Sequence, residues 1–143
     1  MSIQLREMTI DDYQAVYALW SASEGIGLSD ADSKEGIMRF MEHNPGLSYV
    51  AMDGDRVVGA ALCGQDGRRG YIHHLAVANS YRRQGIGRSL VSRCMFALMQ
   101  IGIAKCHLFV FDQNQGAIDF WNKVGWTERV ELLMMSQHVG DQP

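Results

Sequence analysis

Apolar residues recur along the chain at two spacings, and the spacing of three and four positions predicts four helices. The clearest helix runs from Gly85 to Gln100, and Gly102 follows it where a C-terminal cap belongs. The other helices follow Thr9, end before Asn44-Pro45-Gly46, and span Gln115–Val124. The apolar stripe of the clearest helix consists of Ile86, Leu90, Val91, Cys94, Leu98 and Ile101.

Short apolar runs bounded by turn residues predict the strands between these helices. Asp53-Gly54-Asp55 is a strong turn signal, so the strands on either side of it are expected to form a hairpin. The expected strands are Ile3–Arg6, Leu47–Met52, Val57–Cys63, Gly70–Ala78, Lys105–Phe111 and Val130–Met135. The resulting order of elements is typical of a layered α/β fold. With 143 residues and no internal repeat or linker, residues 1–143 are expected to form a single domain.

The charge of the chain limits the partners it can have. The formal net charge is −3, whereas a general nucleic-acid binder would be strongly basic. The charge is nevertheless uneven, because no Asp or Glu lies between Arg82 and Phe111, while four arginines and a lysine do. A local cationic field in an acidic protein suits a small polyanionic ligand better than a long one.

The three cysteines, Cys63, Cys94 and Cys106, are an odd number without short paired spacing. This pattern fits neither a disulfide framework nor a metal site, and small residues of a reduced core are the expectation. Without a signal peptide or a run of membrane-spanning length, we expect a cytoplasmic protein that uses neither a membrane nor a nucleic acid as its partner.

The segment from Leu75 to Leu90 has the features of a phosphate-binding turn. A strand is expected to end near Val77 and a helix to begin near Gly85, and the free N–H groups and positive dipole end of such a helix favour an anion. Gly85 and Gly87 allow backbone N–H groups to approach a phosphate without a Cβ in the way. Charge-assisted hydrogen bonds to the same oxygens can come from Arg82, Arg83 and Arg88.

Two common phosphate-binding patterns do not fit this segment. The Walker loop requires a Gly-Lys-Ser/Thr sequence that is missing, and the dinucleotide fingerprint requires a small residue where Leu90 stands. What remains is Leu75-Ala76-Val77 followed by Arg82-x-x-Gly85-x-Gly87. This pattern resembles the acetyl-CoA-binding motif of the GNAT (general control-type) superfamily of N-acetyltransferases.

A second motif strengthens the resemblance. Asn114-x-x-Ala117-x-x-Phe120-Trp121-x-x-x-Gly125-Trp126 is similar to a later signature of the same superfamily. The resemblance implies the GNAT-type acyl-CoA N-acyltransferase fold, with a central mixed, mostly antiparallel sheet of six to seven strands and about four flanking helices. It further implies an acyl-CoA-dependent N-acetyltransferase with acetyl-CoA as co-substrate.

The resemblance also assigns cofactor contacts. The backbone of Leu75 and Val77 would face the pantetheine arm, residues 82–88 would hold the pyrophosphate, and Asn114 would contact the cofactor arm. The implied cofactor-binding residues are Leu75, Ala76, Val77, Arg82, Arg83, Gln84, Gly85, Ile86, Gly87, Arg88 and Asn114.

Direct attack by an amine needs a base and an oxyanion donor. In such a fold the thioester would lie where the strands at 71–77 and 105–111 diverge, with a backbone N–H near Leu75 or Val77 as the oxyanion donor. His73 titrates in the useful range and is our candidate for the base or its water relay. Tyr71 is a second catalytic candidate, because it would line the same cleft. Neighbouring residues on a strand point to opposite faces, so His74 is expected to pack under a helix on the other side from His73.

Trp121 departs from the superfamily, many members of which have a tyrosine there that protonates the departing thiolate. Indole cannot serve as a practical acid, so the thiolate would leave unassisted or take its proton from water or another side chain. The departure keeps open the alternative of an acyl-CoA-binding or sensing module without turnover. A nucleotide-binding module that uses the same turn is a further alternative.

The acceptor is not specified by any motif. Glu24, Asp30 and Asp32 fall in the loop Ser21–Asp32, which the resemblance places beside the acceptor, and they favour a cationic amine of a small molecule, a peptide or a protein. The last expected strand, Val130–Met135, could also pair across a homodimer.

Overall fold

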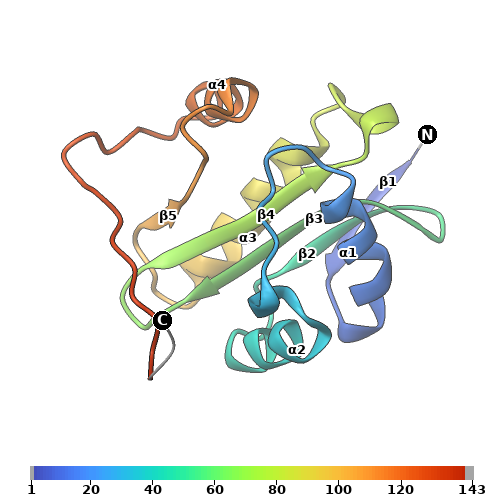
Figure 1. Ribbon diagram of the computed structural model, residues 1–143. Helices are drawn as coiled ribbons and strands as arrows, with labels where there is room; N and C mark the ends of the chain where they lie inside the picture. The colour runs from blue at the N-terminus through green and yellow to red at the C-terminus, as the bar shows by residue number, and fades with distance from the viewer. Residues whose placement is uncertain (1, 141–143) are drawn as a thin grey trace. The chain divides into compact units, whose positions relative to one another are not determined.

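The computed structural model describes residues 2–140, and these residues contain a five-stranded sheet (Figure 1). The strands lie in chain order. The first four pair antiparallel with one another, and the last two pair in parallel. The strands are β1 (Ile3–Glu7), β2 (Tyr49–Asp53), β3 (Arg56–Gln65), β4 (Gly70–Val77) and β5 (Cys106–Leu108). The expected mixed, mostly antiparallel sheet is confirmed, with fewer strands than predicted.

Helices cover both faces of this sheet. Figure 1 shows α1 (Tyr13–Ser21) and α2 (Lys34–His43) on one face and α3 (Ile86–Gln100) on the other. Three short 3-10 turns connect the elements: η1 (Ile10–Asp12), η2 (Asp30–Asp32) and η3 (Asn79–Tyr81). The chain divides into two compact units after Phe111, and the second unit contains α4 (Gln115–Lys123).

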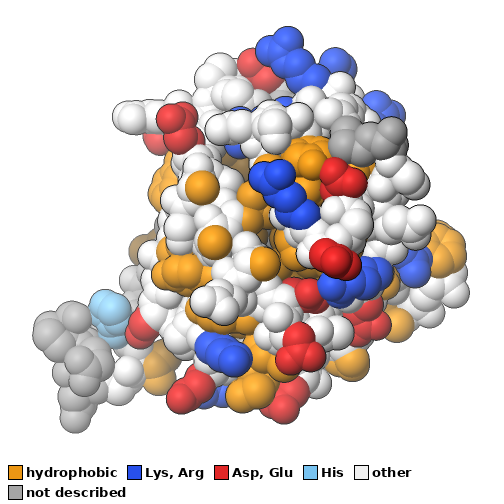
Figure 2. Space-filling view, turned by 90° about the vertical axis from the view of Figure 1, so that its right-hand side faces the viewer, with side chains coloured by type: hydrophobic (Ala, Val, Ile, Leu, Met, Phe, Trp, Pro, Cys, Tyr) orange, Lys and Arg blue, Asp and Glu red, His pale blue; other side chains and the backbone are white. Residues whose placement is uncertain are grey.

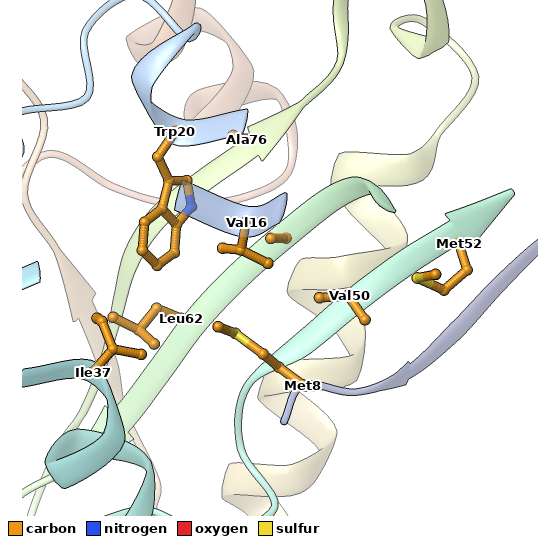
Figure 3. Close-up of a cluster of buried hydrophobic side chains, with 9 residues drawn as sticks. Met8, Val16, Trp20, Ile37, Val50, Met52, Leu62 and Ala76 are labelled. Atoms are coloured by element: carbon orange, nitrogen blue, oxygen red, sulfur yellow. The ribbon is translucent and has the colours of Figure 1, made fainter. Parts of the chain in front are cut away.

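The main core lies between the sheet and the pair α1 and α2. Figure 3 shows side chains from both helices and from β2, β3 and β4 pointing toward one another. Trp20 of α1 is fully buried at its centre, and Ile37 of α2 is nearly so. The members of this cluster are Met8, Val16, Trp20, Ile37, Val50, Met52, Ala60, Leu62 and Ala76.

The opposite face of the sheet is packed by the apolar stripe of α3. Gly59 and Gly70 bring the sheet close to this helix, since a Cβ at Gly59 would lie 3.1 Å from Leu90 and one at Gly70 would lie 2.6 Å from Leu98. The helix ends at Gln100 with Ile101 as its C-cap, and Gly102 follows as predicted, with a φ of 84°. The Gly102 N–H bonds to Met99 O and the Ile103 N–H to Leu98 O, which is the Schellman pattern.

The prediction of a closing strand at Val130–Met135 is wrong, because this stretch forms no ladder in the described part of the chain. Its apolar side chains are exposed, among them Leu133 and Met135. A strand needs a partner edge as well as an apolar run, and periodicity reports only the run. The proposed pairing across a homodimer therefore loses its basis. The strand expected at Lys105–Phe111 is shorter than predicted and covers only Cys106–Leu108.

Within the described residues the cysteines are free thiols. Cys63 and Cys94 are buried, as expected for core residues, whereas Cys106 is half-buried. Desolvation and the neighbouring Cys63 raise the pKa of Cys106 to about 12.

Acidic and basic side chains are interspersed on the face in Figure 2, which does not present one continuous area of a single sign. No helix between residues 2 and 140 is both long enough and apolar enough to cross a membrane.

Candidate active site

Strand β4 loses its parallel neighbour part of the way along its length. Residues Gly70–Ile72 pair with Cys106–Leu108, and the ladder ends there. On its other edge β4 remains paired with β3 as far as Val77. The second half of β4 therefore has one edge without a strand partner in the described chain, as expected for diverging strands.

A bulge interrupts β4 at the same point. Leu62 pairs with His73 and Ala60 pairs with Ala76, so two residues of β4 lie opposite the single Ala61 of β3. His74, the first of these two, has a φ of 53°, which costs a residue with a Cβ about 1–2 kcal/mol. Such strain at one position is a reason to suspect a functional role.

The bulge brings both histidines to one face of the sheet. His73 pairs with Leu62, which faces the core under α1 and α2. The ring of His74 lies 5.0 Å from the ring of Trp20 in that core. The expectation that His73 and His74 point to opposite faces is therefore wrong, because strict alternation fails where a strand contains an extra residue. The predicted packing of His74 under a helix is confirmed.

The bulge also shifts the residues that follow it. Ala76 packs in the core under α1. Val77 pairs with Gly59, where an added Cβ would point toward α3. His73 and Val77 therefore lie on opposite faces of the sheet, whereas two residues four positions apart on a regular strand would share a face.

His73 is half-buried and held by rings on two sides. The Phe40 ring of α2 meets it edge-on at 5.9 Å, and the Tyr71 ring stacks on it at 6.3 Å. Burial is the main cause that lowers the pKa of His73 below 6.5; the neighbouring His74 lowers it further, and Asp32 partly opposes the change. His73 is therefore neutral at pH 7 and can accept a proton.

Tyr71 belongs to an aromatic row at the start of β4. Its ring stacks on His73 on one side and on Phe109 on the other, the latter at 6.4 Å. His107 of β5 contacts it at 5.8 Å. The structure thus brings together both predicted catalytic candidates, Tyr71 and His73.

A hydrogen bond to a buried carboxylate holds His74. Its Nε2 lies 2.8 Å from Oδ1 of Asp32, whose side chain is only 8% exposed. The Ser29 N–H donates to the other carboxylate oxygen at 3.0 Å, and the Tyr13 hydroxyl donates to the Asp32 carbonyl at 2.6 Å. The orientation of Asp32 is thus fixed from three directions.

Both histidines line a cavity of about 750 Å³ between η2, α2 and the strands β3 and β4. Three carboxylates lie in its wall, and one arginine lies with them. Its lining includes the titratable side chains of Asp30, Asp32, Glu35, Arg39, His73 and His74. Asp30 and Asp32 of the predicted acceptor loop thus border a cavity, whereas Glu24 does not line it.

The predicted phosphate-binding turn joins β4 to α3. Arg83 has a φ of 62° and Gly85, the N-cap, a φ of 80°. The Ser89 N–H bonds to Gly85 O, so the three preceding amides, at 86–88, lie before the first helical hydrogen bond. The backbone of this turn thus presents N–H groups at the amino end of a helix of 15 residues.

The side chains of the predicted cofactor residues have two different environments. Those of Ala76 and Ile86 are buried in the protein, which leaves only their backbone for a ligand. Arg82 donates to the Val77 carbonyl at 3.1 Å and is exposed. Leu75, Val77 and Gly87 are half-buried, and the exposed members of the turn are Arg82, Arg83, Gln84, Gly85 and Arg88.

Asn114 and Trp121 belong to the second unit. The Asn114 side-chain oxygen accepts from the Ala117 N–H at 3.1 Å and thereby caps α4, while its amide NH₂ group remains available as a donor. Trp121 packs edge-on against Phe120 and Trp126, with both rings 5.1 Å away. This packing agrees with a structural role for the indole.

Sequence reasoning missed the pairing of Asp32 with His74. Ser29 and Asp32 have the spacing of a capping box, which could have predicted that this carboxylate is held locally. No local pattern connects it to a histidine 42 positions away. No group of three metal-ligating side chains suited to a metal ion lies within residues 2–140.

The chain matches the family described as Acetyltransferase (GNAT) family over residues 13–126. An acetyltransferase of Pectobacterium atrosepticum is 30% identical over 137 residues, which cover 96% of each of the two chains. This similarity extends over nearly the whole length.

Two solved structures share the fold. The PaiA N-acetyltransferase from Thermoplasma acidophilum in complex with coenzyme A has a TM-score of 0.79 at 21% identity, over 89% of this chain and 91% of its own. The AAC(6')-Iy structure in complex with a bisubstrate analogue, CoA-S-monomethyl-acetylneamine, has a TM-score of 0.76 at 15% identity, over 96% of this chain and 99% of its own.

Proposed function

Since the chain belongs to the Acetyltransferase (GNAT) family, we propose that it transfers an acetyl group from acetyl-CoA to a primary amine by direct attack. The observation that carries this proposal is the path of β4. The strand loses its parallel neighbour after Ile72, passes a strained bulge at His74, and continues to the glycine turn that opens α3.

The cofactor would bind along this path. The amides at 86–88 and the charges of Arg82, Arg83 and Arg88 suit a diphosphate, because free helical N–H groups and guanidinium groups both bind phosphate oxygens. The backbone of Leu75 and Val77 would face the pantetheine arm. The free NH₂ group of Asn114 would be a further donor, and the solved PaiA complex with coenzyme A has the same fold.

The reaction begins when the acceptor loses a proton, since only a neutral amine is a nucleophile. Its nitrogen then attacks the thioester carbonyl carbon, a C–N bond forms, and the carbonyl oxygen becomes an oxyanion that a backbone N–H near Leu75 would stabilise. The C–S bond breaks next, and the thiolate takes the second proton of the nitrogen, directly or through water. His73 is the candidate for the base or its water relay. Tyr71 does not line the cavity but would hold His73 in place through their stacked rings.

The acceptor would enter the cavity of about 750 Å³ beside the histidines. The carboxylates of Asp30, Asp32 and Glu35 in its wall favour a cationic amine over an anionic one. The fold neighbour AAC(6')-Iy was solved with the bisubstrate analogue CoA-S-monomethyl-acetylneamine, so neamine belongs among the compounds to be tested.

Calorimetric titration with acetyl-CoA tests the cofactor, and thiol release tests the turnover. We expect the full chain to bind acetyl-CoA and to release CoA when neamine, cadaverine or a peptide with a free N-terminal alanine is supplied. An anionic amine such as glutamate serves as the control and should release less. A chain that does not bind acetyl-CoA contradicts the proposal, whereas binding without release from any amine favours a sensing module.

A further inference from the structure

Asp32 and His74 form a pair for which the proposed acetyl transfer has as yet no role. Their side chains are 8% and 18% exposed, and the pair joins the η2 turn to the bulge of β4. An ionised carboxylate only accepts hydrogen bonds, so the contact of 2.8 Å requires a proton on Nε2 of His74 and thereby fixes its tautomer. The other ring nitrogen, Nδ1, is then the atom that is free to accept a proton.

The backbone of His74 is strained in order to place this ring. A φ of 53° is unfavourable for histidine, and glycine would adopt it without a Cβ penalty. If the bulge served only to bend β4, the ring and its buried carboxylate would be unnecessary. The bulge instead directs two adjacent histidines into one cavity, with their ring centroids 6.4 Å apart.

The two histidines have different electrostatic surroundings. His73 lies between the rings of Phe40 and Tyr71, whereas His74 has a carboxylate in direct contact. Burial is the main cause that lowers the pKa of His73, and the nearby His74 adds to it because two protonated rings would repel each other. His73 therefore accepts a proton but holds it weakly. The remaining charged or titratable groups of the cavity wall are Asp30, Glu35, Arg39 and His43.

We propose that His74, positioned by Asp32, is the group that receives the acceptor's proton at the end of a path that begins at His73. The inference rests on the proposed acetyl transfer and adds the residues that complete its proton transfer. The acceptor ammonium gives one proton to His73 Nδ1 or Nε2, directly or through water, and His73 passes it through water to Nδ1 of His74. Asp32 stabilises the imidazolium that forms, in the way that a carboxylate supports histidine in hydrolytic triads. The proton then leaves to solvent, so the histidines return to their starting state.

The chain contains a matched control for Asp32. Asp12 also closes a capping box at a 3-10 turn, is also buried, and also accepts from one nitrogen-bearing side chain, Arg6, at 2.7 Å. It lies outside the cavity wall. Asp12→Asn and Asp32→Asn therefore remove similar structural contacts, but only Asp32→Asn removes the partner of His74.

The experiment measures kcat and KM for the full chain between pH 5.5 and 9.5, with the amine that releases CoA fastest from the panel above. We expect Asp32→Asn to lower kcat roughly 100-fold, as the loss of acid–base assistance does, with an unchanged KM for acetyl-CoA and an altered acidic limb of the pH profile. Asp12→Asn should keep the wild-type pH profile and lose only thermal stability. An Asp32→Asn chain with the wild-type kcat and pH profile overturns the proposal.

A second variant tests the ring itself. His74→Gly tolerates the positive φ and leaves space for a free imidazole. We expect added imidazole to restore turnover in proportion to the concentration of its neutral form. A histidine with a purely structural role would not give this rescue. A His74→Gly chain that is fully active without imidazole, or inactive and unaffected by it, overturns the proposal. A wild-type chain that binds acetyl-CoA but releases no CoA from any amine contradicts the proposed transfer instead.

Discussion

Gly85 and Gly102 lie beyond opposite ends of α3, and both have backbone conformations that favour glycine, with φ of 80° and 84°. A Cβ at either position would meet no atom within 4 Å, so an alanine changes the backbone preference without a clash. We expect Gly85→Ala and Gly102→Ala to lower the free energy of unfolding by about 1 kcal/mol each, measured by urea denaturation.

Only Gly85→Ala should also weaken acetyl-CoA binding, by roughly tenfold, because its turn presents the amides for the diphosphate. Calorimetric titration of both variants with acetyl-CoA compares their affinities. If both variants bind acetyl-CoA equally well, the turn before α3 does not hold the diphosphate.

The lowered pKa of His73 predicts how stability changes with pH. The pKa of His73 in the folded chain lies below 6.5, its ordinary value in the unfolded chain. The unfolded chain therefore binds more protons than the folded chain as the pH falls through 6.5. The free energy of unfolding should therefore decrease from pH 7.5 to pH 5.5, and the loss should end below the folded pKa. His73→Phe preserves an aromatic ring beside Tyr71 and should show a smaller decrease in urea denaturation across this range. Equal decreases in both proteins would contradict a buried neutral His73.

At the scale of elements, the position of η2 depends on a glycine of α2. A Cβ at Gly36 would collide with the Ala31 carbonyl, directly before Asp32. Gly36→Ala should therefore displace the η2 turn, reduce stability by about 1–3 kcal/mol and lower kcat, while acetyl-CoA affinity stays the same. Thermal denaturation and the CoA-release assay measure these effects.

Gly116 of α4 is the matched control, because its Cβ would lie 3.9 Å from the nearest atom, Asn114 Oδ1. Gly116→Ala should be neutral or should stabilise the chain by up to about 1 kcal/mol through helix propensity. Comparable losses of stability and kcat in Gly36→Ala and Gly116→Ala would mean that the effect at position 36 does not come from contact with η2.

Elements defined by local chemistry could be predicted from the sequence, and those defined by long-range pairing could not. The helix α3 was predictable because its stripe and its C-terminal glycine lie within one segment. The bulge at His74 was not, since an extra residue in a strand changes the register with β3 without any change in composition. The pair of Asp32 and His74 depends on that bulge, so half of the candidate proton path was beyond sequence reasoning. Val130–Met135 shows the opposite error, an apolar run that lacks a partner strand in the described chain.

At the scale of the whole molecule, the expectation of one domain can be tested by cooperativity. The second unit begins at Asp112 and is short, and segments below about 40 residues rarely fold without support. We therefore expect the two units to unfold together in one transition. Trp20 is buried in the first unit, whereas Trp121 and Trp126 lie in the second, so a Trp20→Phe variant restricts fluorescence to the second unit. Its fluorescence transition in urea should coincide with the circular dichroism transition of the whole chain, and two separate transitions would show two domains.

The central claim is that the amides at 86–88 bind a diphosphate so that a thioester lies where β4 loses its parallel neighbour. A crystal structure of the full chain with acetyl-CoA measures this directly. The account predicts phosphate oxygens within hydrogen-bonding distance of these amides and the acetyl carbonyl beside the bulge that contains His74 and Leu75. A diphosphate bound elsewhere, or an acetyl group remote from that bulge, would contradict it.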